Sequence, residues 1–199
     1  MKRFCCCGLL IALAAPWTAV PVRADGRFME SAYMYSKLEA QRCLENQLKL
    51  YRCLSAYASK HQGRLPAGNN FEGLRQLGAY GADFTLFRCG ESRVKRAKSN
   101  NDLHERCNPF IYFGGMNLEE MRKAAPNAPL LMDKPGSRHL NIVYVNGQTE
   151  TIEADKISRK NSTCRQVVAA LHGRYNYPPE VLAALLLKAD AIDKTLSKR

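Results

Sequence analysis

The longest regular pattern in the chain is a helical one near its N-terminal end. Across residues 28–61, apolar side chains recur three and four positions apart, which is the spacing of the buried face of an amphipathic helix. Gly63 and Pro66 follow this segment and are typical of a helix end. Such a helix is long for a globular domain, so we expect it to pack on an extended surface, most simply a β-sheet. The residues of its expected buried face are Ala40, Cys43, Leu44, Gln47, Leu48, Leu50, Tyr51, Leu54 and Ala58.

The middle of the chain contains short segments typical of strands. Residues 142–145 and 148–152 lie on either side of Asn146 and Gly147. An Asn-Gly pair in this position indicates a hairpin, because both turn residues are expected to have positive φ. The pattern therefore predicts a small antiparallel sheet. The other elements expected here are strands at residues 84–88, 110–113 and 129–132, a short helix at residues 71–80, and a helix capped by Asn117 with Glu119 and Glu120 in its first turn.

The C-terminal part of the chain is again helical. Thr163 and Gln166 form a capping box at the start of one helix, which Gly173 is expected to end. Pro179 is expected in the first turn of a second helix. The predicted fold is thus α+β: a long N-terminal helix packed on a small antiparallel sheet, with a C-terminal helical pair. The expected boundaries are 1–24 for a signal peptide, 25–157 for the α+β domain and 158–199 for a helical appendage.

The first residues have the order of a secretory signal peptide. Lys2 and Arg3 precede an apolar run that ends near Val20, and a small residue, Ala24, closes the segment. We expect cleavage between Ala24 and Asp25, and therefore an exported protein that is periplasmic or extracellular. The alternative is an uncleaved anchor, because the run approaches the roughly 20 residues that cross a bilayer. Nothing later in the sequence is apolar enough to span a membrane, so no transmembrane helix is expected after cleavage.

The chain is strongly basic, with a formal net charge of +12. Cleavage after Ala24 removes Lys2, Arg3 and Arg23 but no acidic residue, which lowers the charge to +9. Such a charge favours anionic partners. We expect envelope glycans or lipid head groups rather than nucleic acid, because the protein is predicted to be exported; the alternative is that the charge only keeps the protein soluble. The candidate contacts to an anionic ligand lie in the polar loop at residues 90–106 and are Arg93, Lys95, Arg96 and Lys98.

Five cysteines follow the expected cleavage site, and an exported protein meets an oxidising compartment in which they can pair. We predict a disulfide between Cys89 and Cys107, which lie at the edges of the strand-like segments at residues 84–88 and 110–113. The bond would close the loop at residues 90–106, which we call the basic loop. The rival hypothesis is that both thiols stay reduced, with His104 close enough to activate one. Cys43 is expected to fill the core or to pair with Cys164. Cys53 is expected near the solvent edge, as the free thiol.

No motif of a known catalytic or cofactor site is present. Asp133 and His139 could form an acid/base pair, although a polar pair at a strand end is the simpler interpretation. The histidines and cysteines show no metal-ligand spacing, so no metal and no cofactor are expected. A pocket that gathered Cys89, His104, Asp133 and His139 would instead indicate an enzyme.

The order of these segments resembles the type II secretion protein G-like, type IV pilin-like proteins (pseudopilins) of planctomycetes and verrucomicrobia. The shared features, over residues 36–153, are the long helix with Cys43-Leu44-Glu45-Asn46-Gln47-Leu48, the segments Phe87-Arg88-Cys89 and Asp133-Lys134-Pro135-Gly136, and His139 ahead of a glycine-containing hairpin. The resemblance implies a pilin-like fold. Pilins begin with an apolar assembly helix after a prepilin cleavage site, whereas Lys37 and Glu39 interrupt that stretch here and a signal peptide replaces it.

The expected function is therefore that of an exported, non-enzymatic, pilin-like protein that acts through contacts with a protein partner in the cell envelope, as a soluble accessory of a secretion or cell-surface apparatus. The alternative is a binding module for anionic glycans or lipid head groups, which would use the basic loop.

Overall fold

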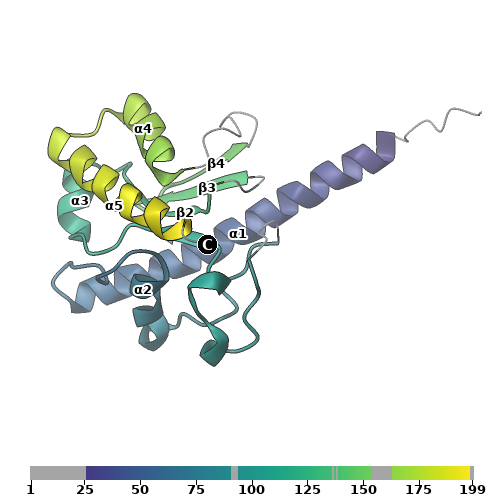
Figure 1. Cartoon of the computed structure of the whole chain (residues 1–199), viewed down its shortest axis with the longest axis horizontal. Coiled ribbons are helices and arrows are strands. Elements are labelled where there is room, and N and C mark those ends of the chain that lie inside the picture. Colours follow the sequence, from purple (N-terminus) through teal and green to yellow (C-terminus); the bar gives the residue numbers. More distant parts are fainter. Residues whose placement is uncertain (1–25, 91–93, 136, 138, 154–162, 198–199) are drawn as a thin grey trace, which may run out of the picture.

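A computed structural model of the chain describes residues 26–90, 94–135, 137, 139–153 and 163–197. The expected signal peptide, the cleavage site at Ala24 and Asp25, and Arg93 lie outside these residues. Among the helices that the structure describes, none combines the length and the apolar character needed to cross a membrane. The fold is α+β, as the pattern predicted (Figure 1).

Helix α1 runs from Gly26 to Lys60, and its C-terminal half packs on the sheet while its N-terminal part projects beyond the rest of the molecule (Figure 1). The predicted helix is confirmed. Its fully buried positions recur three and four residues apart, so they form one stripe along the helix. Leu44, Leu48 and Tyr51 lie at the margin of the stripe and are only partly buried. The buried positions are Glu39, Ala40, Cys43, Gln47, Leu50, Cys53, Leu54 and Ala58.

Four antiparallel strands form the sheet in the order β1-β2-β3-β4, so that each strand pairs with its neighbour in sequence. The described residues of β1, β2 and β3 are buried throughout, which requires cover on both faces. The strands are β1 (Phe110–Tyr112), β2 (Pro129–Asp133), β3 (His139–Tyr144) and β4 (Thr149–Glu153).

The predicted hairpin connects β3 to β4, but its turn differs from the expected one. Gly147 has a φ of 84°, whereas Asn146 is not among the described residues with positive φ. The Gly147 N–H donates to the Tyr144 carbonyl, and the Tyr144 N–H donates to the Gln148 carbonyl. A tight turn followed by a left-handed glycine is a three-residue hairpin loop, so only one position needs positive φ.

The C-terminal helices α4 (Cys164–Tyr175) and α5 (Pro179–Ser197) cover the face of the sheet opposite to α1. In β3, the Asn141 side chain donates to the Ala40 carbonyl of α1, while the Tyr144 ring packs edge-on against Tyr175 of α4. Residues three apart in a strand point to opposite faces. Both helices belong to the same hydrophobic core as the sheet. The pair is therefore not an appendage with its own core.

The caps of these helices agree with the sequence in part. Thr163 accepts a hydrogen bond from the Gln166 N–H, as the capping box predicts. Gly173 does not end α4; the helix continues to Tyr175, and Asn176 ends it in the left-handed conformation with a φ of 50°. Asparagine tolerates that conformation better than most residues, which is why the later position could end the helix.

The segment between α1 and β1 contains helical turns rather than a further strand. The expected helix at residues 71–80 is split into α2 (Asn70–Leu74) and the 3₁₀ helix η1 (Arg75–Tyr80). The strand expected at residues 84–88 is absent from these described residues, which form turns instead, with the Leu86 N–H donating to the Asp83 carbonyl. Two further 3₁₀ turns are η2 (Asn100–Asp102) and η3 (Glu105–Cys107).

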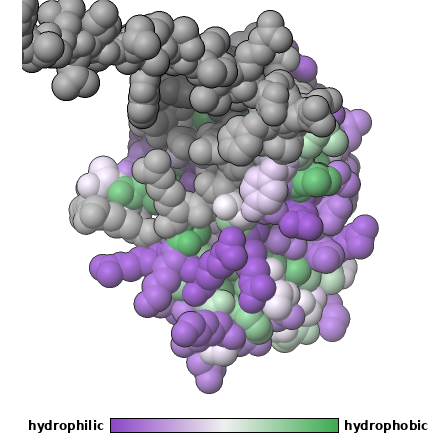
Figure 2. Space-filling model, turned by 90° about the vertical axis from the view of Figure 1, so that its right-hand side faces the viewer, coloured by the Kyte–Doolittle hydropathy of each residue, from purple (hydrophilic) through white to green (hydrophobic). Residues whose placement is uncertain are grey.

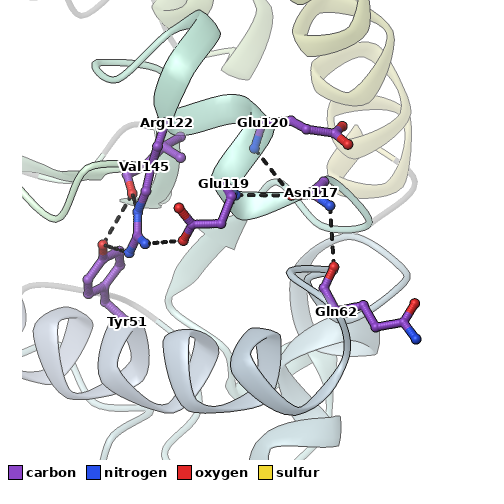
Figure 3. Close-up of polar contacts among 7 residues, drawn as sticks. All are labelled: Tyr51, Gln62, Asn117, Glu119, Glu120, Arg122 and Val145. Carbon is purple, nitrogen blue, oxygen red and sulfur yellow. Dashed lines mark hydrogen bonds and ion pairs between the residues drawn. The ribbon is translucent and has the colours of Figure 1, made fainter.

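Helix α3 (Leu118–Ala124) holds the C-terminal end of α1. Asn117 caps α3 by accepting from the N–H groups of Glu119 and Glu120, and its amide donates to the Gln62 carbonyl just after α1 (Figure 3). One turn later, Arg122 donates to the Tyr51 hydroxyl and the Val145 carbonyl (Figure 3). These contacts link α1, α3 and the hairpin.

Candidate functional site

Four residues that can bind a metal converge at the point where α1 crosses the sheet. Cys43 comes from α1, Cys89 from the segment before the basic loop, Asp133 from the end of β2 and His139 from the start of β3. Their ligand atoms all lie within 4.8 Å of one another. All four residues are buried, with exposed fractions between 1% and 5%.

The His139 ring faces two of the other members through the same atom. Its Nε2 lies 3.7 Å from Cys89 Sγ and 3.4 Å from Asp133 Oδ2. A nucleophile–histidine–carboxylate relay needs the nucleophile and the carboxylate on different ring nitrogens, because one nitrogen takes the proton while the other is held. Here Cys89 and Asp133 both lie next to Nε2 of His139, which is the arrangement expected of groups that bind a common metal ion.

A second layer of polar contacts fixes the carboxylate. Gln47 of α1 donates to Asp133 Oδ1 at 2.8 Å, and the Asn141 N–H donates to Asp133 Oδ2 at 2.8 Å. Gln47 and Asn141 are themselves fully buried. Such outer contacts orient a ligand group and are typical of metal sites.

The backbone near Cys89 is held against α1 from both sides. The Asn46 amide donates to the Arg88 carbonyl at 3.0 Å. Gly90 has no side chain at the point where the buried Glu39 carboxylate packs, so a larger residue there would require the Glu39 side chain to move. This close approach brings the Cys89 sulfur to the helix.

Burial opposes charge on the residues of this cluster. It raises the pKa of Asp133 to about 7, although the neighbouring His139 acts in the opposite direction. The pKa of Cys43 is raised well above its usual range, first by its hydrogen bond with Cys89 and then by burial. Without a cation, the Cys43 thiol therefore stays protonated.

The cysteines are arranged differently from the sequence-based prediction. All five described cysteines are outside disulfides in the structure, so the predicted bond between Cys89 and Cys107 is not present. Cys107 Sγ instead lies 3.6 Å from His104 Nε2. The prediction required paired strands at residues 84–88 and 110–113, whereas β1 pairs with β2 and the first segment forms turns.

The remaining cysteines also lie apart from one another. Cys53 is buried, which raises its thiol pKa, so its expected place at the solvent edge is wrong. Cys164 begins α4 beside Asp193, on the other face of the sheet from Cys43, so these two are not paired.

The cluster shares three members with the catalytic set considered from the sequence. Cys89, Asp133 and His139 come together as that hypothesis required. The fourth member is Cys43 and not His104, which lies beside Cys107. Sequence spacing missed the cluster because its members are spread over residues 43–139 and come from four segments. The available signal was local: a cysteine on the apolar face of the helix, and an aspartate and a histidine at adjoining strand ends.

One basic residue of the predicted anion site, Arg96, lies next to the cluster. Lys95, Arg96 and Lys98 are exposed. Arg96 joins Arg42 and Arg88 around a hollow of about 500 Å³ that Cys43 also lines. Glu39 and Glu45 line the same hollow, so its charge is mixed rather than purely basic.

Comparisons with known proteins identify no relative: no protein-family model, no curated protein and no solved structure matches this chain.

Proposed function

We propose that this is an exported, non-enzymatic, pilin-like protein that acts through contacts with a protein partner of the cell envelope, as a soluble accessory of a secretion or cell-surface apparatus. The observation that carries the proposal is the projecting part of α1, which bears three large apolar side chains in solvent. Met34, Tyr35 and Leu38 are 51%, 61% and 51% exposed.

These three side chains share one side of the helix. Positions 34, 35 and 38 fall within about 100° around the helix axis. Met34 and Leu38 lie on the side of the helix away from the stripe that packs on the sheet, whereas Tyr35 lies nearer to the stripe and also lines the hollow beside Cys43. Grouped apolar side chains at the surface are typical of protein interaction sites. A long helix that packs on an antiparallel sheet and extends past it supports the resemblance to pilin-like proteins.

The experiment is a capture assay on envelope extract from the source organism. The processed protein is the bait, and the triple variant Met34→Ser, Tyr35→Ser and Leu38→Ser is compared with Leu187→Ser. Leu187 is the matched control because it is 73% exposed but belongs to α5. We expect a specific captured protein that the triple variant loses and the control retains. Equal capture by all three baits would contradict the proposal.

A second candidate function is binding to anionic glycans or lipid head groups, supported by the exposed Lys95, Arg96 and Lys98, of which Arg96 lines the hollow together with Arg42 and Arg88. Among the described residues visible at the end of the molecule from which α1 projects, most side chains are hydrophilic, with apolar ones scattered between them (Figure 2). If this candidate is right, salt abolishes binding to sulfated glycan or to anionic vesicles. Replacing the three loop residues by Ala does the same, whereas Ala at Lys49, Lys123 and Lys194 has little effect.

A further inference from the structure

We propose that Cys43, Cys89, Asp133 and His139 form a binding site for a single zinc ion. The four residues are buried, their ligand atoms converge, and they come from four different segments of the chain. This inference is independent of the proposed function, because it concerns the interior of the molecule rather than its surface.

The distances match those around a tetrahedral zinc ion. Zinc lies about 2.3 Å from cysteine sulfur and about 2.0–2.2 Å from histidine nitrogen or carboxylate oxygen, so its ligands lie about 3.6 Å apart for a sulfur–nitrogen pair and about 3.4 Å for a nitrogen–oxygen pair. The observed separations are 3.7 Å between Cys89 Sγ and His139 Nε2, and 3.4 Å between His139 Nε2 and Asp133 Oδ2.

Only a small contraction completes the site. Two sulfur ligands of tetrahedral zinc lie about 3.8 Å apart. Because no pair of ligand atoms is more than 4.8 Å apart, the widest pair has to close by no more than about 1.2 Å. Rotation of a cysteine side chain moves its sulfur by such a distance without a change of the backbone.

The donor set selects the metal. Two thiolates and an imidazole favour zinc over magnesium or calcium, which prefer oxygen ligands. Two thiolates and one carboxylate would leave a net charge of −1 with Zn²⁺. The amide of Gln47 and the N–H of Asn141 donate to the carboxylate and disperse that charge. The adjoining hollow, which Arg42, Arg88 and Arg96 line together with Glu39 and Glu45, reaches Cys43.

A disulfide between Cys43 and Cys89 is the rival use of the same atoms. It would account for the two sulfurs and would leave Asp133 and His139 as a buried ion pair, but it gives no reason for Cys89 to approach the same ring nitrogen as Asp133. Zinc accounts for all four residues and for their convergence on His139 Nε2, so we favour the metal and let the disulfide be an outcome of the test.

The site would fasten the base of the projecting helix. Cys43 lies close to the point where the buried stripe of α1 begins, and the other ligands belong to the sheet and to the segment before the basic loop (Figure 1). Metal ligation across these segments would therefore stabilise the attachment of α1, since binding to the folded state alone raises stability.

The test is zinc binding by the full chain as purified, handled without chelator and with thiols reduced. We expect one zinc per chain by elemental analysis, its removal by a strong chelator, and its return on titration with Zn²⁺. Replacement by Co²⁺ should give the sulfur-to-metal charge transfer and the intense visible bands of tetrahedral thiolate coordination. The melting temperature should fall when the metal is removed.

Variants locate the site. Cys89→Ser and His139→Gln should weaken zinc binding by tenfold or more. Cys107→Ser should bind normally, and it is a matched control because Cys107 also has a histidine neighbour at 3.6 Å. Circular dichroism shows whether each variant folds, and the Zn²⁺ titration of the unaltered protein needs no variant. Failure of the reduced protein to bind Zn²⁺, an equal loss in Cys107→Ser, or a Cys43–Cys89 disulfide in zinc-free protein that does not take up zinc after reduction would each overturn the proposal.

Discussion

Individual side chains on α1 differ in how much of the helix–sheet contact they carry. Leu50 and Leu54 are completely buried, whereas Leu44 and Leu48 lie at the margin, and Leu48 lines a shallow groove beside Tyr144. The sequence places Leu48 on the buried face of the helix, and the loss of a buried leucine side chain costs about 2–5 kcal/mol. The structure assigns that cost to Leu50 instead. Around the helix axis, the middle of the buried stripe of α1 points in the direction of Cys43 and Leu54, and Leu50 lies close to that direction.

Leu50→Ala should therefore lower the free energy of unfolding by about 2–5 kcal/mol, since it leaves a cavity between α1 and the sheet. Leu48→Ala should cost about 1 kcal/mol, because only part of its side chain leaves water on folding. Denaturant unfolding of both variants under one metal condition measures the difference. Equal costs would mean that α1 is rotated relative to the arrangement described here.

Some elements of this fold are joined at their ends by hydrogen bonds of a capping side chain. Asn117 is the clearest case: it caps α3 through its side-chain oxygen and reaches the end of α1 through its amide (Figure 3). The left-handed Gln62 and Gly63 bring the chain back towards it, and the Leu118 N–H donates to the Gly63 carbonyl at 2.7 Å.

Asn117→Ala should destabilise the protein by about 1–2 kcal/mol, because two N–H groups at the start of α3 lose their acceptor. Asn117→Asp should recover most of this loss, since its carboxylate accepts the same bonds and is favoured near a helix N-terminus. Thermal unfolding of the unaltered protein and the two variants measures these effects. If Asn117 does not act as a cap, Asn117→Asp and Asn117→Ala would lower the melting temperature equally.

On the scale of the whole molecule, the buried side chains on both faces of the sheet belong to one hydrophobic core. Leu185 of α5 and Ile142 of β3 belong to the same cluster as Leu54 of α1. Polar contacts add to the packing on the face that α4 and α5 cover. The hydroxyls of Tyr144 and Tyr175 donate to the Glu150 carboxylate, and Arg174 forms an ion pair with the same carboxylate. The C-terminal helices are therefore part of the folding unit.

Removal of residues 158–199 should consequently prevent folding rather than trim the protein. It would expose the buried face that carries Ile142 and Tyr144, and a sheet uncovered on an apolar face is prone to aggregation. The full chain should unfold in a single cooperative transition. A soluble fragment ending at residue 157 with native strand content, or two separate transitions in the full chain, would contradict this and restore the appendage.

Much of the architecture was available from the sequence, because it is set by short-range patterns. The three-and-four spacing of α1, the alternation around the hairpin, the Asn117 and Thr163 caps and Pro179 at the start of α5 all act within a few residues. The fold class followed from them. Two kinds of prediction were wrong. The end of α4 was placed at Gly173, although Asn176 a few residues later could also end the helix and does so. Residues 84–88 were predicted to form a strand, but this short apolar segment has no strand to pair with.

The tertiary structure alone decided which distant residues meet. Cys43, Cys89, Asp133 and His139 share no motif, and their convergence depends on how α1 crosses the ends of β2 and β3 and on how closely Gly90 lets the intervening segment approach. The same holds for the C-terminal helices, whose apolar stripes the sequence displayed but whose place on the second face of the sheet it did not. Local periodicity determines each element and the side that it buries, whereas the packing of one element on another, which sets the site, depends on contacts between residues far apart in the chain.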